Sequence, residues 1–354
     1  MKKLISLFCL CILLGQLVFL TGCPKTAQKA DNKPKGMVYF TYFDTVSYIY
    51  SYANDSQEQF EANCSALSGI LGDYHNLFDI YYEYSGINNL CTINKNAGGD
   101  PLPVDERLIE FLLYAKELYT LTSGEMNVMM GAVLRPWHDC RTNASDDPQN
   151  AKLPDINDLK ERSTHTDINS LEIDIDNKTV RITDPKASID VGALGKGYAT
   201  EMAARYLKKK GVGSYVLNIG GNIRIIGTKT DGGGWLTGIK DPNDPDNAYA
   251  SYVELSNTSC VTSGIYERYF TVGGVRYHHI IDKDTLMPSE HFSSITVLTE
   301  HSGLADALST ALFCMSYEDG SALAGSIDGV EVLWIFNDGT QKHTSGYVPA
   351  NVNN

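Results

Sequence analysis

The chain has 354 residues, of which 43% are hydrophobic and 20% charged, which is the composition of a globular protein long enough to bury a core. Its formal net charge is -14. Such an acidic balance argues against nucleic acid as a partner, because neutralising phosphates requires a basic face.

The first residues have the pattern of an export signal. Lys2 and Lys3 are followed by an apolar run from Leu4 to Leu20, and the segment ends Leu20-Thr21-Gly22-Cys23. It resembles a bacterial lipoprotein signal peptide, which is cleaved before the lipidated cysteine. We therefore expect residues 1–22 to be removed, residues 23–36 to form a lipidated cysteine and flexible tether, and the protein to be anchored outside the cytoplasmic membrane through Cys23. An uncleaved membrane helix is the alternative, and it would also export the domain.

The cysteines that remain in the mature chain show no metal-like spacing and no CxxC pair. We expect these residues to be small buried hydrophobes without a disulfide framework. They are Cys64, Cys91, Cys140, Cys260 and Cys314.

Two amphipathic helices are predicted near the start of the domain. Residues 37–52 form a strand pair or one long strand, and Ser56 or Asn54 then caps a helix with an apolar stripe from Phe60 to Phe78. A second helix starts near Asp105. Residues 81–86 form an aromatic loop between them, whose rings either stack on a flavin or purine or are ordinary surface tyrosines. Residues 142–154 are predicted to be a polar loop.

A glycine-rich bend occupies the centre of the chain. Residues 188–191 predict a short strand, three glycines follow, and a helix runs from Lys196 to the lysines before Gly211. Such a bend directs backbone N–H groups towards an anion, which favours a phosphate site. The glycine spacing matches neither the P-loop nor the dinucleotide pattern. Close packing of helix on strand therefore remains an alternative role for the glycines.

The second half of the chain is rich in predicted strands. Two apolar runs surround a glycine pair at 218–222, strands follow at 235–240, 250–255 and 259–262, and hairpins are predicted at 269–281 and 330–344. No repeat or linker divides the chain. We predict one α/β (α+β) domain over 37–346, with helices packed on a mixed or largely antiparallel sheet, followed by a tail at 347–354.

A helix at 302–315 carries a further chemical signal. Asp306 and Thr310 are four residues apart and share a face, so a carboxylate and a hydroxyl point the same way. Two such oxygens match part of a Mg²⁺ shell completed by waters, phosphates and a carbonyl. The alternative is an exposed aspartate and a threonine bonded to its own helix.

The ordered set of motifs is more specific than any single one. It runs FDT (from Phe43), IYYEYS (Ile80), GEMN (Gly124), IDVGALGKGYA (Ile189), NIGGN (Asn218), VTSGIYERYF (Val261), HIIDKDT (His279) and ADALSTAL (Ala305). This order resembles the ApbE-type FAD:protein FMN transferases, which are commonly exported lipoproteins. The resemblance covers nearly the whole mature chain.

The resemblance implies a reaction and a set of site residues. FAD would be split at its pyrophosphate, FMN would pass to a threonine hydroxyl of an acceptor flavoprotein, and AMP would be released. Mg²⁺ would be held by the main-chain oxygen of Ala193 and the side chains of Asp306 and Thr310. The catalytic candidates are Asp306 and His279, the latter as general base; His278 is its rival, but alternation along a strand allows only one of the pair to point inward. The implied FAD contacts are Phe43, Tyr81, Glu125, Met126, Asn127, Asp190, Lys196 and Ile281.

Three positions depart from the family pattern. Phe43 stands where many members have methionine, Asn127 where an aspartate is common, and Ser309 where some members have a second helix aspartate. Asn127 removes a charge from the implied FAD contact, and Ser309 removes one from the implied metal site. Two other functions fit the same residues: an extracytoplasmic FAD pyrophosphatase that yields FMN and AMP, and a lipoprotein that binds flavin without chemistry.

Overall fold

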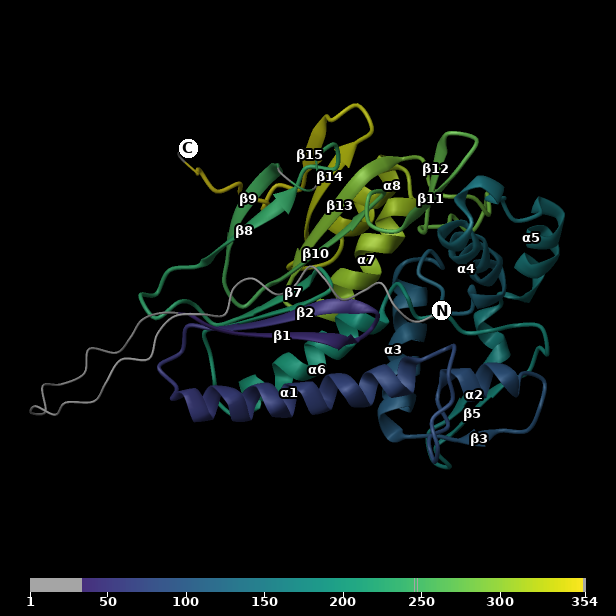
Figure 1. The fold of residues 1–354 in the computed structure, drawn as a ribbon, viewed down its shortest axis with the longest axis horizontal. Helices are drawn as coiled ribbons and strands as arrows, with labels where there is room; N and C mark the ends of the chain where they lie inside the picture. Colours follow the sequence, from purple (N-terminus) through teal and green to yellow (C-terminus); the bar gives the residue numbers. More distant parts are fainter. Residues whose placement is uncertain (1–33, 245, 247, 353–354) are drawn as a thin grey trace, which may run out of the picture. The chain divides into compact units, whose positions relative to one another are not determined.

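The computed structural model describes residues 34–244, 246 and 248–352, so the predicted signal peptide, Cys23 and most of the tether lie outside the described residues. Its main feature is an antiparallel sheet with the strand order β1-β2-β6-β7-β10-β13-β14-β15 (Figure 1). The strands are β1 (Lys35–Tyr42), β2 (Thr45–Ser51), β6 (Tyr215–Ile219), β7 (Asn222–Ile226), β10 (Ser259–Gly264), β13 (Phe292–Thr299), β14 (Glu331–Phe336) and β15 (Gln341–His343). The predicted α/β fold with a largely antiparallel sheet is confirmed.

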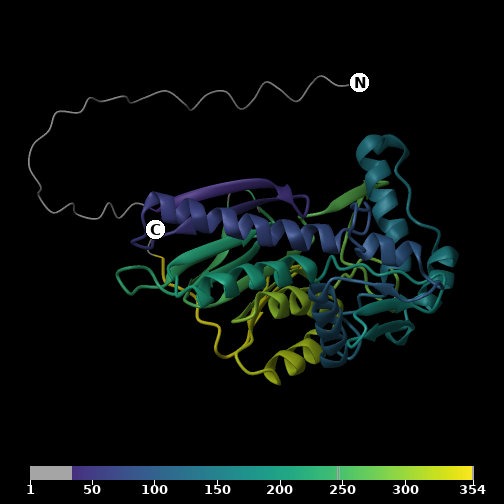
Figure 2. The same cartoon turned by 90° about the horizontal axis from the view of Figure 1, so that it is seen from below.

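Helices cover one face of this sheet, and a hairpin covers the other. Figure 2, which views the molecule from below, shows α1, α6 and α7 side by side. Along β14, Val332 and Trp334 face α7, whereas Leu333 and Ile335 pack against β8 and β9. The helices are α1 (Gln57–Phe78), α2 (Leu90–Lys95), α3 (Glu106–Leu121), α4 (Gly131–Asp146), α5 (Ile156–Arg162), α6 (Gly195–Lys209), α7 (Ser302–Cys314) and α8 (Tyr317–Gly325).

Apart from the β8–β9 hairpin and α8, the remaining elements gather at one end of the large sheet (Figure 1). A core around Trp137 and Phe270 joins α4 to the hairpin of β11 and β12, and Leu159 of α5 belongs to it. This end of the domain carries much of the candidate site. The smaller strands are β3 (Leu102–Pro103), β4 (Leu171–Asp174), β5 (Thr179–Ile182), β8 (Trp235–Lys240), β9 (Tyr249–Leu255), β11 (Tyr269–Val272) and β12 (Val275–His278). Short 3₁₀ turns lie at Pro148–Asn150, Ser163–His165 and Ile168–Ser170.

Elements with strong local signals form as predicted. The Ser56 side chain accepts a hydrogen bond from the Gln59 amide and caps α1, whose apolar stripe is buried. Helix α6 ends before Gly211, which has a φ of 70°. The five cysteines of the domain are free thiols; Cys64, Cys91 and Cys260 are buried as predicted, whereas Cys140 and Cys314 are only half-buried. Within the described residues, no helix has the length and apolarity needed to span a membrane.

The predicted strand at 188–191 is wrong. Only Ser188 makes an isolated bridge, to Met130. The Asn94 side chain takes the place of a neighbouring strand, because its amide donates to the Ile189 carbonyl at 2.9 Å and accepts from the Ile189 N–H at 2.7 Å. The backbone N–H and C=O groups of Ile189 therefore have hydrogen-bond partners without a neighbouring strand.

Three boundaries also differ from the prediction. The polar segment predicted at 142–154 begins as the last turn of α4, which continues through Pro136 to Asp146. Lys35 and Gly36, predicted as tether, pair with β2. The predicted tail at 347–354 begins packed on the domain, since Tyr347 is buried and the Ala350 N–H donates to the Tyr252 carbonyl at 2.7 Å.

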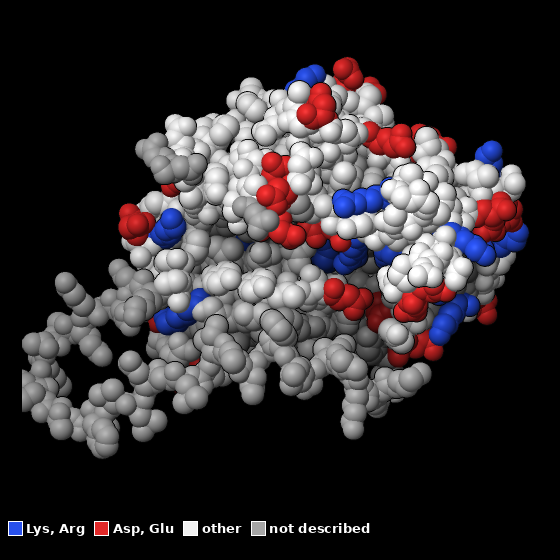
Figure 3. Space-filling model, turned by 45° about the horizontal axis from the view of Figure 1, so that its top comes forward, with Lys and Arg blue, Asp and Glu red and all other residues white. Residues whose placement is uncertain are grey.

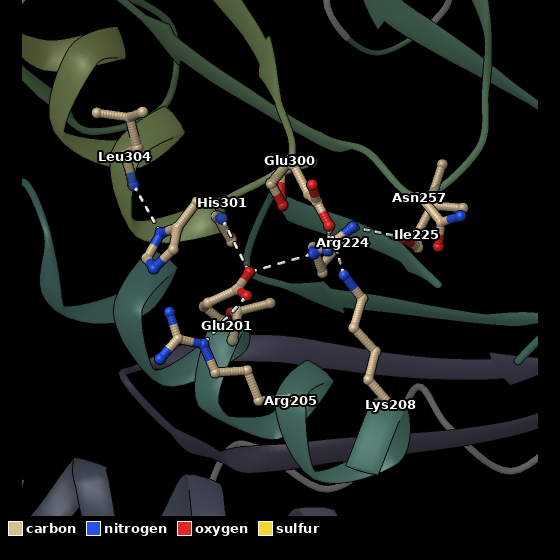
Figure 4. A network of polar contacts seen from close by, with 12 residues as sticks. Glu201, Arg205, Lys208, Arg224, Ile225, Asn257, Glu300, His301 and Leu304 are labelled. Atoms are coloured by element: carbon tan, nitrogen blue, oxygen red, sulfur yellow. Dashed lines mark hydrogen bonds and ion pairs between the residues drawn. The ribbon is translucent and has the colours of Figure 1, made fainter. Parts of the chain in front are cut away.

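A buried ion pair joins the helix layer to the sheet (Figure 4). Arg224 of β7 is fully buried, and its Nε lies 3.2 Å from Oε2 of Glu201 on α6. The same oxygen accepts a hydrogen bond at 3.1 Å from the N–H of Ser302, the first residue of α7. Glu201 therefore ties α6, β7 and α7 together. Glu300 also approaches Arg224, at 3.9 Å, but its side chain is exposed and pairs with Lys208.

We predict that Glu201→Gln destabilises the domain by ~3–5 kcal/mol, because it leaves the buried Arg224 guanidinium without its counter-charge. Chemical unfolding of the purified domain measures the change. The matched control is Glu300→Gln, which removes an exposed carboxylate near the same guanidinium and should cost no more than ~1 kcal/mol. Equal effects of the two substitutions would contradict this role for Glu201.

Candidate active site

The first turn of α6 and the middle of α7 meet at one carboxylate. Oδ2 of Asp306 accepts a hydrogen bond of 2.8 Å from the Gly197 N–H, and Asp306 is only 4% exposed. A Cβ on residue 197 would lie 2.4 Å from the Cβ of Asp306 and 2.5 Å from the Ser302 carbonyl oxygen, so only glycine fits. Gly197 therefore allows close packing, but of α6 on α7 rather than of a helix on a strand, and this packing brings the carboxylate to the bend.

Asn222 connects this carboxylate to Lys196. With its amide oriented to satisfy both neighbours, Asn222 donates to Oδ1 of Asp306 at 3.2 Å and accepts from Nζ of Lys196 at 3.1 Å. It is the first residue of β7, directly after the Gly220-Gly221 turn, and is 1% exposed. Sequence reasoning did not select Asn222, although it closes the Asn-Ile-Gly-Gly-Asn motif.

Opposing effects set the charge of Asp306. Burial raises the pKa of its carboxyl group, while the positive charge of Lys196 and the hydrogen bonds from Gly197 and Asn222 act against that rise. The net shift is upward, so a nearby cation would favour the ionised form. A cation bound next to Asp306 would therefore lower the pKa of its carboxyl group and keep it ionised.

The groups around Asp306 suit a hard cation. In the part of the chain that the structure describes, neither the Ala193 carbonyl oxygen nor the Thr310 hydroxyl has a hydrogen-bond partner. Ser309 is occupied elsewhere, since its Oγ lies 2.8 Å from Oγ of Ser263 and 2.9 Å from the Asp306 carbonyl oxygen. No group of three His, Cys, Asp or Glu side chains that could hold a metal occurs among the described residues. An ion here would thus rely on one carboxylate, neutral oxygens and its substrate.

A second cluster lies where the bend begins. Asp190 is 8% exposed, its Oδ1 accepts from the Gly192 N–H at 2.8 Å, and its own N–H donates to the Val128 carbonyl at 2.8 Å. His138 of α4 places Nδ1 3.8 Å from Oδ2 of Asp190 and 2.9 Å from the Tyr81 hydroxyl. Burial lowers the pKa of His138, and Asp190 opposes the shift. Sequence reasoning missed His138 because it did not predict α4.

The Glu125–Asn127 loop lies next to this cluster, and its three residues have different surroundings. Met126 is buried in the main core. The Asn127 amide donates to the Thr166 carbonyl at 2.9 Å and accepts from the Met129 N–H at 2.9 Å, so it holds the loop in place. Glu125 pairs with Lys283 at 3.3 Å; burial raises its pKa, and the Lys283 charge opposes the rise.

Histidines 278 and 279 lie in different surroundings. Both ring nitrogens of His278 are engaged, with the Ser289 carbonyl at 2.8 Å and the Ile280 N–H at 3.2 Å. Its neighbour His279 lies just beyond the end of β12 rather than within the strand, and its buried Nδ1 has no partner among the described residues. Burial first, then the charges of Arg268 and Arg141, lower the pKa of His279 well below 6.5.

Two predicted contacts lie at the edges of the site. Phe43 is in the β1–β2 turn with a φ of 54°, and its ring meets the edge of His75 at 5.6 Å. Just after that turn, the Val46 carbonyl of β2 accepts a hydrogen bond of 3.1 Å from the Gly220 N–H. Ile281 follows His279 and packs against the core around Trp137. Among the described residues, no hydrogen bond or ring contact joins Phe43 to the other predicted site residues.

The fold is that of ApbE proteins, whose solved structures superpose on it. The ApbE family model matches residues 44–334. The chain belongs to the ApbE family.

Relatives and solved structures agree with this membership. The chain is 32% identical over 273 residues to the FAD:protein FMN transferase of Treponema pallidum, covering 73% of this chain and 74% of the relative. It is 27% identical over 339 residues to the Vibrio cholerae enzyme of the same name, covering 94% and 96%. The structure of the ApbE protein from Thermotoga maritima superposes with a TM-score of 0.77 at 28% identity, covering 88% of this chain and 97% of that one. The flavin transferase ApbE of V. cholerae gives 0.74 at 25% identity, covering 88% and 96%.

Proposed function

We propose that this protein is an FAD:protein FMN transferase, which moves FMN from FAD to a threonine hydroxyl of an acceptor flavoprotein and releases AMP. Family membership supports this function. The observation that carries it is the meeting of Lys196, Asn222 and Asp306 at the first turn of α6. A helix N-terminus with a lysine and a buried carboxylate suits a phosphate group and its cation.

In this proposal Asp306, Thr310 and the Ala193 carbonyl hold Mg²⁺. Two observations support the assignment: Thr310 follows Asp306 by one turn of α7, and Ala193 lies in the bend before α6, whose Gly197 N–H bonds to the buried Asp306 carboxylate. When bound, Mg²⁺ neutralises phosphate oxygens and thereby makes phosphorus open to attack. Lys196 adds a positive charge on the same side, and Asn222 holds Lys196 and Asp306 at fixed separation.

The predicted FAD contacts fall into groups around this centre. Asp190 and Tyr81 meet through His138, and the Glu125–Asn127 loop is bonded to Asp190 through the Val128 carbonyl. Ile281 lies two residues from Lys283, the ion-pair partner of Glu125. Tyr81 is 45% exposed, so its ring is open to a ligand. Phe43 would contact the substrate from the β1–β2 turn.

His279 is proposed as the general base. It is neutral at pH 7, because its pKa lies well below 6.5, and it has a ring nitrogen without a partner. The threonine oxygen attacks the FMN-side phosphorus, its proton passes to His279, and the bond to the adenylate oxygen breaks with its electron pair on AMP.

We also propose that the protein works outside the cytoplasmic membrane, held by a lipid on Cys23. Support comes from the order of charged, apolar and Leu-Thr-Gly-Cys segments at residues 1–23. The acceptor would then be a redox protein of the membrane or surface.

The transfer is tested with residues 23–354, FAD, Mg²⁺ and a candidate acceptor, followed by fluorescence of the denatured acceptor band. We expect a fluorescent band that disappears when the target threonine of the acceptor is changed to alanine. Asp306→Asn should abolish it, because the metal loses its one carboxylate while the Gly197 N–H keeps an oxygen acceptor. AMP release that does not require acceptor would indicate a pyrophosphatase instead. FAD binding with neither product would indicate a carrier.

His279→Gln should lower kcat by ~10²–10⁴ and leave FAD affinity unchanged, since only proton transfer is lost. The matched control is His278→Gln, which loses structural hydrogen bonds and should reduce thermal stability more than kcat. In the wild type, lowering the pH protonates the base only well below pH 6.5, so activity should persist to lower pH than for an ordinary histidine. An acid limb at or above pH 6.5, or full activity in His279→Gln, would remove His279 from this role.

A further inference from the structure

Among the described residues, two arginines of this acidic protein, Arg141 and Arg268, have neither an ion pair nor a ring contact. Nine arginines occur in the described residues, and six of them form ion pairs with carboxylates. Arg276 instead lies 4.7 Å from the centroid of the Tyr269 ring. Arg141 and Arg268 have neither a hydrogen bond from their side chains nor an ion pair with any described residue.

Both arginines line the same pocket of about 300 Å³. Arg141 comes from α4, together with the hydroxyl residues Thr142 and Ser145, and Arg268 comes from the segment before β11. The acidic residues Asp146 and Glu267 also line the pocket, but neither pairs with an arginine. On the face drawn in Figure 3, basic side chains gather near the middle, between acidic ones.

The two guanidinium groups lie close enough to repel each other. Burial and the charge of Arg268 together lower the pKa of Arg141. The charge of Asp190 acts in the opposite direction, but among the described residues Asp190 forms no ion pair with Arg141. The two like charges therefore raise the free energy of this region, and a bound anion would reverse that effect. Arginine is suited to phosphate in particular, because its planar fork donates two parallel hydrogen bonds.

This pocket adjoins the proposed active site. Arg141 also lines a small cavity together with His138 and His279. The charges of both arginines act on His279, and Arg268 joins Lys196 in acting on Asp306. An anion between Arg141 and Arg268 would therefore lie beside the base and within the electrostatic range of the carboxylate.

We propose that Arg141 and Arg268 form a second anion site, separate from Lys196 and Asp306, that binds a phosphate group of the dinucleotide and stabilises AMP as it leaves. The inference rests on the proposed function. As the threonine oxygen bonds to the FMN phosphorus, the electron pair of the broken P–O bond moves to the adenylate oxygen, and the threonine proton moves to His279. The added charge on AMP is then met by the two guanidinium groups.

Calorimetric titration of the apoprotein, without Mg²⁺ or acceptor, tests this site with ADP, AMP and riboflavin as probes. Arg141→Gln and Arg268→Gln should each weaken ADP and AMP by about tenfold or more, the effect of losing a charge-assisted hydrogen bond. Riboflavin, which has no phosphate, should bind as in the wild type. Arg162→Gln on α5 removes the same charge outside both cavities and should leave all three affinities unchanged.

The two phosphate sources are separated by the probes. A loss for both ADP and AMP supports the site as proposed, on the leaving adenylate. A loss for ADP alone would keep the arginines on the pyrophosphate but overturn their role in stabilising AMP. Unchanged ADP and AMP affinity in correctly folded variants, with only the KM for acceptor raised, would overturn it and make the pair an acceptor contact. The titration needs no turnover, so the two claims are tested separately. Unchanged nucleotide affinity in the arginine variants would not contradict FMN transfer, and absence of transfer would not contradict a measured role of the arginines in nucleotide binding.

Discussion

The hydrogen bond between the Asp306 carboxylate and the Gly197 amide is the contact on which the rest of the site depends. It joins the start of α6 to the middle of α7, and it forms only because residue 197 has no side chain to separate the helices. Asn222 and Lys196 then stabilise the ionised carboxylate. The buried Glu201–Arg224 pair holds the same helices to β7 one turn further along α6, so the position of Asp306 is fixed from two directions.

Charge is distributed unevenly between this site and the rest of the molecule. The whole chain has a formal charge of -14, yet Lys196, Arg141 and Arg268 act together on His279. An anionic substrate would be repelled by most of the protein and attracted here. Burial first, and then the same cations, lower the pKa of His279, which connects substrate binding to the protonation state that the proposed base requires.

Local sequence signals predicted most of the elements that carry the site. The features that they did not predict depend on contacts between residues far apart in the sequence or lie on a helix with a weak local signal. The cap at Ser56, the glycine at 211 and the periodicity of α7 sufficed to place three helices. Helix α4 was missed because its second half is polar and Pro136 interrupts the pattern, and His138 and Arg141 were missed with it. The Asn222–Asp306 contact joins residues distant in sequence, so no local pattern could reveal it. Likewise, hydrogen bonds from the Asn94 side chain to the backbone of Ile189 occur where a strand was predicted.

The most direct test of the central role of Asp306 is a crystal structure of the protein with FAD and Mn²⁺ in place of Mg²⁺. An anomalous difference map should contain a Mn²⁺ peak bonded to the carboxylate of Asp306, with the Thr310 hydroxyl and the Ala193 carbonyl in the same coordination shell and a phosphate oxygen of FAD completing it. Bound FAD with the Mn²⁺ peak elsewhere, or with Asp306 still bonded only to Gly197 and Asn222, would contradict it.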